Sequence, residues 1–170
     1  MIYTERQRFD QLWLIVLFCS ETAVMLAFGL YKAVKEADFT LLFIVPVPLL
    51  FYFLLNRLLW LDVRVDAAGI YYRFAIFGRR LIGWNELSAV FIRRYDPLSE
   101  YGGWGYKKGW KRKNRVINVK GDMGLQLVFH NGNRLLIGTS QPRELKMFLV
   151  NLAHSQHGTI PLRTEVIHAG

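Results

Sequence analysis

Cysteine is nearly absent from this 170-residue chain, and acidic residues are scarce beside the basic ones. The single cysteine, Cys19, excludes an intramolecular disulfide and a zinc site built from cysteines. With 13 Asp and Glu against 22 Lys and Arg, the formal net charge is +9. Residues 57–170 hold 18 of the basic residues and 8 of the acidic ones. The C-terminal part therefore favours an anionic partner, membrane headgroups first and nucleic acid or acidic proteins second.

Catalytic motifs are also lacking. His130, His154, His157 and His168 are scattered without the spacing of a metal-binding motif. No serine lies in a nucleophile-elbow context. The glycines of residues 102–105 match neither a dinucleotide-binding nor a P-loop pattern, so we interpret them as structural. The sequence predicts a protein that is not an enzyme and that takes no metal and no cofactor.

Two long uncharged runs, interrupted only by Glu21, occupy the first third of the chain. Gln11–Tyr31 and Phe39–Leu55 each approach the roughly 20 apolar residues that a transmembrane helix needs. They predict spans at about 11–31 and 39–59, which form a helical hairpin that with an N-terminal arm takes up residues 1–60. The alternative is a buried pair of helices in a soluble protein, which the lack of a polar face on either run disfavours.

The charges that flank the runs predict an orientation. A short polar turn over residues 32–38 forces an antiparallel hairpin, so both termini lie on one side. Arginines gather on the terminal side, whereas the turn has only Lys32 and Lys35. Positive charge favours the cytoplasmic side. We therefore expect a multi-pass protein of the cell inner membrane with both termini in the cytoplasm.

Glu21 and two prolines lie within the predicted spans. Pro46 and Pro48 release the carbonyl groups of Leu42 and Ile44, which the Glu21 carboxyl group would bond in a packing role. A proton or substrate pathway is the alternative, because ionisable residues within membranes are often functional.

After the hairpin, apolar residues alternate with polar ones and then follow a helical spacing. The alternation predicts seven strands, at residues 61–66, 70–75, 80–83, 87–95, 116–120, 125–130 and 133–138. A helix is predicted from Pro142, with Leu145, Phe148, Leu149 and Leu152 on one buried face.

Three stretches carry a resemblance to known families. Val63–Arg73 (VRVDAAGIYYR) and Leu81–Val90 (LIGWNELSAV) resemble the opening strands of bacterial pleckstrin-homology-like domains, which two membrane helices often precede. Tyr95–Gly109, followed by GLQLVF and RLLIGTSQPREL, is similar to an uncharacterised bacterial family of short two-helix membrane proteins. The resemblance implies an α+β fold in which residues 61–156 form a seven-stranded, bent antiparallel sheet capped by a C-terminal helix, with a tail over residues 157–170. It implies a binding module and no known reaction.

A basic, aromatic stretch is the candidate binding site. Residues 101–115 contain six cations and no acidic residue, and Trp104, Tyr106 and Trp110 lie among the cations. Cations gain about 1 kcal/mol each near anionic lipid, and Trp and Tyr favour the interfacial layer. The candidate residues for binding lipid or another anionic partner are Trp104, Tyr106, Lys107, Lys108, Trp110, Lys111, Arg112, Lys113 and Arg115. Arg79 and Arg80 are additional candidate cations.

Other interpretations of this stretch stay open. Eukaryotic pleckstrin-homology domains bind phosphoinositides through a basic loop between their first two strands, whereas here that turn is the uncharged Ala67-Ala68-Gly69. Headgroup contact would then have little specificity, and the stretch is alternatively a solvated cytoplasmic flank. A protein partner would bind the groove beside the final helix or a strand edge, and the hairpin would pair with another membrane protein or a second copy. Nucleic acid is disfavoured by the membrane tether.

Overall fold

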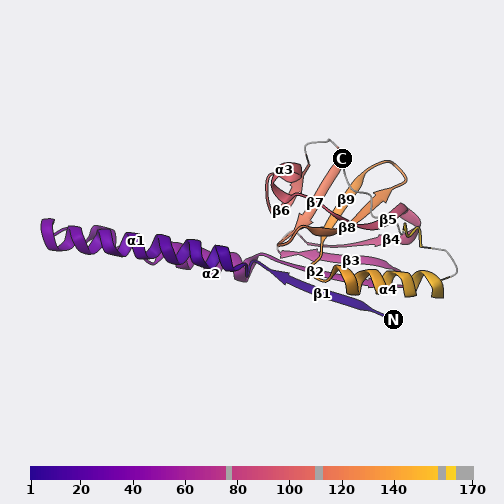
Figure 1. Ribbon diagram of the computed structural model, residues 1–170, viewed down its shortest axis with the longest axis horizontal. Helices are drawn as coiled ribbons and strands as arrows, with labels where there is room; N and C mark the ends of the chain where they lie inside the picture. The colour runs from indigo at the N-terminus through magenta and orange to yellow at the C-terminus, as the bar shows by residue number, and fades with distance from the viewer. Residues whose placement is uncertain (76–77, 110–112, 157–159, 164–170) are drawn as a thin grey trace. The chain divides into compact units, whose positions relative to one another are not determined.

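The computed structural model of the chain describes residues 1–75, 78–109, 113–156 and 160–163. The chain divides into two compact units. Phe9–Leu59 forms a helical unit, and a sheet domain combines Met1–Arg8 with the chain from Trp60 onward. Figure 1 traces the elements of both units in chain order. The sheet domain is therefore discontinuous in sequence.

The helical unit contains two helices that are long and apolar enough to cross a membrane. α1 spans Leu12–Glu36, and the second candidate span, Thr40–Leu58, joins the short 3-10 helix η1 (Thr40–Phe43) to α2 (Val47–Leu58). In the most apolar 18-residue stretch of α1 only 11% of the residues are buried, and in the corresponding stretch of the second span none are buried. A core helix of a soluble protein would be mostly buried, so these exposed apolar surfaces agree with the predicted spans.

The hydrogen bond expected between the carboxyl group of Glu21 and the backbone carbonyl of Ile44 is replaced by a backbone hydrogen bond. The carbonyl oxygen of Ile44 accepts a hydrogen bond from the N–H of Val47 at 3.0 Å. The side chain of Glu21 is exposed. The released carbonyl of Ile44 is thus taken by the turn that starts α2, and the packing role predicted for Glu21 is not supported there.

Nine strands form two sheets in the described part of the sheet domain. The first sheet is antiparallel with the order β1-β2-β3-β4: β1 Tyr3–Arg8, β2 Trp60–Asp66, β3 Gly69–Phe74 and β4 Arg79–Gly83. The second has the order β5-β8-β9-β7-β6: β5 Leu87–Arg94, β6 Gly105–Lys108, β7 Asn114–Asn118, β8 Met123–Phe129 and β9 Arg134–Gly138. β7 and β9 pair in parallel. The prediction of one antiparallel sheet with seven strands is therefore wrong in the number of sheets, in the number of strands and in the parallel pairing of β7 with β9. Each of the seven predicted runs is nevertheless a strand.

β1 is one of the two strands that the alternation does not predict. It pairs with β2 along its whole length, from Tyr3 opposite Val65 to Arg8 opposite Trp60. The N-terminal arm expected beside the hairpin is therefore the edge strand of the first sheet.

The inward-facing side chains of β1 explain why its pattern was missed. Glu5 and Gln7 are both buried, 7% and 1% exposed, at positions where apolar residues are expected. The Gln7 side chain donates from Nε2 to the carbonyl oxygen of Gly138 at 2.7 Å. Polar residues on the core side remove the apolar alternation that identifies a strand.

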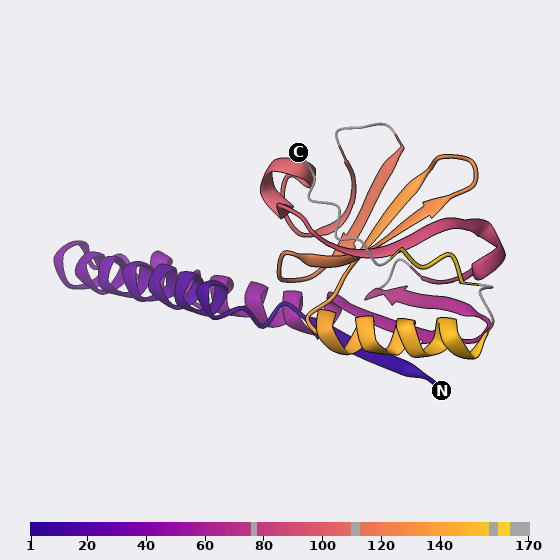
Figure 2. The ribbon, with the colours of Figure 1, turned by 45° about the vertical axis from the view of Figure 1, so that its right-hand side comes forward.

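The core is formed by the inward faces of both sheets and by the C-terminal helix α4 (Pro142–Ser155). Leu145, Leu149 and Leu152 are buried on α4 as predicted, and Phe148 packs its ring 5.8 Å from that of Tyr3. Figures 1 and 2 show α4 running beside the strands of the first sheet. Two short helices, η3 (Trp84–Glu86) and α3 (Pro97–Tyr101), flank β5.

Candidate functional site

The basic, aromatic stretch forms a hairpin at the edge of the second sheet. β6 pairs with β7 from Gly105 opposite Asn118 to Lys108 opposite Arg115. We call residues 104–118 the basic hairpin. Of the nine candidate residues, Trp110, Lys111 and Arg112 lie outside the described residues. The other six are described.

Strand alternation sorts these residues by face. Directly opposed residues of an antiparallel pair share a face, and successive residues alternate. Tyr106, Lys108 and Arg115 therefore lie on the same face of the hairpin, and all three are exposed. Lys113, which precedes β7, is also exposed. The structure thus brings four of the candidates to the surface.

Two candidate residues bond to the protein backbone instead. Lys107 lies on the opposite face and donates from Nζ to the carbonyl oxygen of Gly102. Trp104 is half-buried and donates from Nε1 to the carbonyl oxygen of Gly121 at 3.3 Å. Both side chains hold the base of the hairpin against the domain.

Arg79 and Arg80 separate onto opposite faces of β4, as consecutive strand residues must. Burial raises the pKa of the Tyr72 hydroxyl above its usual value, and the positive charges of Arg80 and Arg115 oppose that rise. Arg80 and Arg115 of the basic hairpin thus both act on the hydroxyl of Tyr72. Arg79 is opposite Arg73 on the other face of the first sheet.

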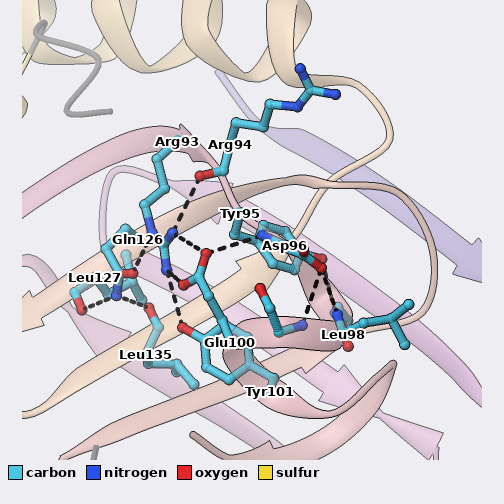
Figure 3. A network of polar contacts seen from close by, with 12 residues as sticks. Arg93, Arg94, Tyr95, Asp96, Leu98, Glu100, Tyr101, Gln126, Leu127 and Leu135 are labelled. Carbon is cyan, nitrogen blue, oxygen red and sulfur yellow. Dashed lines mark hydrogen bonds and ion pairs between the residues drawn. The ribbon is translucent and has the colours of Figure 1, made fainter. Parts of the chain in front are cut away.

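A buried arginine anchors the segment that leads into the basic hairpin (Figure 3). Arg93 on β5 is 7% exposed, and its two terminal nitrogens donate to the two carboxylate oxygens of Glu100 at 3.0 and 2.7 Å. It also donates to the hydroxyl of Tyr101 at 3.1 Å and, from Nε, to Oε1 of Gln126 at 3.0 Å. This network fixes α3 against β5 and β8.

Local sequence chemistry defines both ends of α3. The Asp96 carboxylate accepts from the backbone N–H groups of Leu98 and Ser99 at 2.9 and 3.2 Å, which caps the helix. These bonds, with Ser99 the larger contributor, lower the pKa of Asp96. Gly102 ends the helix with φ 68°, a left-handed conformation that glycine adopts without strain.

Asn118 connects the basic hairpin to the core. It is fully buried, donates from Nδ2 to the hydroxyl of Tyr95 and accepts from the N–H of Gly105, both at 2.9 Å. Burial raises the pKa of Tyr95 to about 12, so its hydroxyl stays neutral and accepts this bond at physiological pH. The glycine-aromatic stretch Tyr95–Gly109 therefore acts as the support that holds the hairpin.

A second cationic surface was missed by the sequence reasoning. It lies on the exposed face of the first sheet and includes Arg6 and Arg8 of β1. Arg6 and Arg8 are two residues apart, as on one face of a strand, but only the pairing with β2 shows that this segment is a strand. This surface is described further below.

Neither a search for metal-binding clusters nor a comparison with known proteins indicates a function. Among the residues that the structure describes, no group of three His, Cys, Asp or Glu side chains could hold a metal ion. Comparison with known protein families and with curated protein sequences finds no match for this chain.

Proposed function

We propose that the chain is a two-span inner-membrane protein whose cytoplasmic, pleckstrin-homology-like domain is an interaction module that contacts the anionic membrane surface through the basic hairpin. The carrying observation is the shared exposed face of Tyr106, Lys108 and Arg115, with Lys113 exposed nearby in the chain. Each cation near anionic lipid contributes about 1 kcal/mol, and tyrosine favours the interfacial layer. The contact selects negative charge rather than one headgroup.

Membrane insertion is supported by the apolar surface of the helical unit. Large side chains there are widely exposed, for example Val34 at 82%, Phe43 at 83% and Phe53 at 62%. Soluble monomers rarely expose contiguous apolar patches larger than a few hundred Å². A bilayer removes this surface from water.

The strand order supports the pleckstrin-homology-like assignment. The four strands of the first sheet and the antiparallel run β5-β8-β9 give seven strands, which α4 follows. β6 and β7 come between β5 and β8 in sequence, and they join the second sheet through the parallel pair β7–β9. The basic hairpin is thus an addition to a seven-stranded framework.

Lysine reactivity in a bilayer tests the proposed contact. The full chain in phosphatidylcholine nanodiscs is compared with the chain in nanodiscs that also contain phosphatidylglycerol, using an amine-acetylating reagent and mass spectrometry. We expect Lys108 and Lys113 to react several-fold more slowly in the anionic nanodiscs, and exposed Lys146 of α4 to react equally in both. Equal reactivity of Lys108 and Lys113 in the two bilayers would contradict the proposal.

A protein partner is the second candidate, favoured by an apolar groove beside α4. The groove has a volume of about 340 Å³, and its lining includes Ile92, Leu149, Val150 and Leu162. Next to it, the backbone of Val90 on β5 bonds to residues 161 and 163, each at 2.8 Å. This edge of β5 is thus already used for strand-like pairing, as in peptide addition to a sheet.

The groove is tested by substitution. We expect Val150→Glu to remove a partner that co-purifies with the native full chain in mild detergent, while Met147→Glu, on the exposed part of α4, leaves it bound. Identical sets of co-purifying proteins for the native chain and V150E would exclude this groove as the partner site.

A further inference from the structure

The exposed face of the first sheet carries a regular array of arginines. Pairing registers put Arg6, Asp62, Arg73 and Arg79 in one row across β1 to β4. The row before it pairs Arg8 with Trp60. The row after it consists of Thr4, Arg64, Tyr71 and Leu81. We call Arg6, Arg8, Arg64, Arg73 and Arg79 the arginine face.

Carboxylates neutralise only two of these five cations in the described chain. Arg6 donates from Nε to Asp62 at 2.7 Å, and Arg64 donates from Nη2 to Asp66 at 2.9 Å. The remaining three, Arg8, Arg73 and Arg79, form no ion pair within the described residues. The arginine face therefore keeps a positive charge that water and counterions must balance.

Arg73 and Arg79 are directly opposed on neighbouring strands. Side chains in this relation have Cβ atoms about 5 Å apart, and like charges there are destabilising. An anion between the two guanidinium groups would relieve this repulsion. Arginine presents a planar fork of N–H donors that matches the oxygens of a phosphate group, and two such forks would bind one phosphate from both sides.

Trp60 fixes the orientation of the neighbouring cations. The guanidinium carbons of Arg6 and Arg73 each lie 4.8 Å from the centroid of its ring. Arginines held against an aromatic ring lose less freedom when they bind a ligand. The surface over the arginine face is hollowed, with a volume of about 770 Å³ bounded by residues that include Arg73, Arg79 and Tyr71.

We propose that the arginine face binds the phosphate group of a membrane phospholipid between Arg73 and Arg79. The inference rests on the proposed function, because it assigns a second headgroup contact to the same domain. Arg8 is the last residue of β1 before α1 begins at Leu12, and Trp60 is the first of β2 after α2 ends at Leu58. The row formed by Arg8 and Trp60 is therefore only a few residues along the chain from the predicted spans.

Arginine reactivity and calorimetry test the site on the full chain in non-ionic detergent. The probes are dihexanoyl phosphatidic acid and inorganic phosphate, and phenylglyoxal modification is followed residue by residue by mass spectrometry. We expect dihexanoyl phosphatidic acid to slow modification of Arg73 and Arg79 several-fold and to leave exposed Arg143 of α4 unchanged. Absence of protection at Arg73 and Arg79 by either probe overturns the site.

Matched variants separate a site from diffuse charge. The double variant Arg73→Gln, Arg79→Gln should weaken binding of the short-chain lipid at least tenfold, and Arg143→Gln should leave it unchanged. Arg73→Lys with Arg79→Lys keeps the charge but loses the forks, so we expect a several-fold loss. Binding by the lysine variant equal to that of the native chain overturns the proposal in favour of non-specific attraction. Both arginines are exposed, and circular dichroism verifies that each variant is folded.

The two probes distinguish the source of the phosphate. Inorganic phosphate should bind at least tenfold more weakly than the short-chain lipid, because it lacks the glycerol and acyl groups that would contact Leu81 and Trp60. Equal binding of both probes overturns the assignment to a phospholipid. Protection of Lys108 and Lys113 in anionic nanodiscs without protection of Arg73 and Arg79 overturns this inference and leaves the proposed function standing.

Discussion

Arg93 is a buried cation whose hydrogen-bonding capacity is completely used. Its five N–H donors bond to Gln126, Tyr101, the backbone carbonyl of Arg94 and both oxygens of Glu100. Removing a guanidinium group from water is costly unless every donor finds an acceptor. The stability of α3, and with it the base of the basic hairpin, therefore depends on one carboxylate.

Glu100→Gln tests this dependence. Without the carboxylate, Arg93 keeps a buried charge without a counterion, and we expect the free energy of unfolding at neutral pH to fall by about 2 to 3 kcal/mol. Denaturant unfolding of the full chain in detergent measures the change. Glu144→Gln, on the exposed first turn of α4, serves as the control and should cost no more than about 1 kcal/mol.

Glu100→Gln should also change how the free energy of unfolding depends on pH. Burial alone would raise the pKa of Glu100, but the hydrogen bonds and positive charge of Arg93, together with the hydrogen bond from the backbone N–H of Asp96, lower it overall. A carboxyl group with a lowered pKa in the folded state stabilises the protein above its unfolded pKa, about 4.3, and this contribution is lost as the pH falls through the folded value. The stability difference between the native chain and E100Q should therefore narrow below about pH 4. A difference that stays constant as the pH falls further below 4 would contradict this explanation.

At the level of elements, β1 is attached to the domain by a buried carboxylate. Glu5 accepts from the hydroxyls of Tyr3 and Thr139 at 2.8 and 2.7 Å. It also accepts from the backbone N–H and the hydroxyl of Ser140, at 2.7 and 2.6 Å. Ser140 lies just before α4, so this carboxylate joins the edge strand of the first sheet to the start of the C-terminal helix.

Glu5→Ala should loosen β1 while the rest of the sheet domain stays folded. The buried hydroxyl of Thr139 and the part-buried donors of Ser140 would lose their acceptor, at a cost of about 2 to 4 kcal/mol. We expect backbone amide exchange to accelerate in β1 and at the start of α4, measured by hydrogen–deuterium exchange with mass spectrometry. Thr4→Ala, on the exposed face of the same strand, is the control, and equal exchange in both variants would exclude this role of Glu5.

Sequence patterns predicted those elements whose buried side chains are apolar. The runs of β2 and β3 alternate apolar and polar residues, and Leu145, Leu149 and Leu152 mark the inner face of α4. β1 was missed because Glu5 and Gln7 face the core, and β6 because its four residues are mainly glycine and lysine. Polar residues that satisfy one another inside a fold leave no periodic signal, since their partners are distant in sequence.

At the level of the whole molecule, the sheet domain is assembled from two segments that the helical unit separates. Arg8 and Trp60 are directly opposed where the chain leaves the first sheet and where it returns. Composition predicted two helices that are long and apolar enough to cross a membrane, because a helix forms its backbone hydrogen bonds internally and a long apolar run is enough to identify it. The domain boundary could not be predicted, because the pairing of β1 with β2 bridges the entire helical unit.

Replacing Phe9–Leu59 with Asn-Gly should yield a folded sheet domain that is soluble in water. Antiparallel strands whose end residues are directly opposed can be joined by a two-residue turn, and Asn-Gly is a favoured sequence for it. Size-exclusion chromatography and thermal unfolding measured by circular dichroism test this variant. We expect a monomer with a single cooperative transition.

A chain that begins at Trp60 is the informative comparison. It lacks β1, so β2 becomes an uncovered edge and the donors of Thr139 and Ser140 lose Glu5. Exposed strand edges promote aggregation. Lower solubility and a lower melting temperature than the Asn-Gly variant are expected, and equal behaviour of the two chains would show that β1 is dispensable.

The separation of β1 from β2 also constrains biosynthesis. β1 leaves the ribosome before its pairing partner β2, which is translated only after both candidate spans have been made. Joining two segments across a long flexible loop has an entropic cost, which falls when the loop itself becomes ordered. Packing of α1 against α2 would therefore bring the ends of the two strands together before the first ladder forms. Defects in helix pairing should then slow the maturation of a domain whose own residues are unchanged.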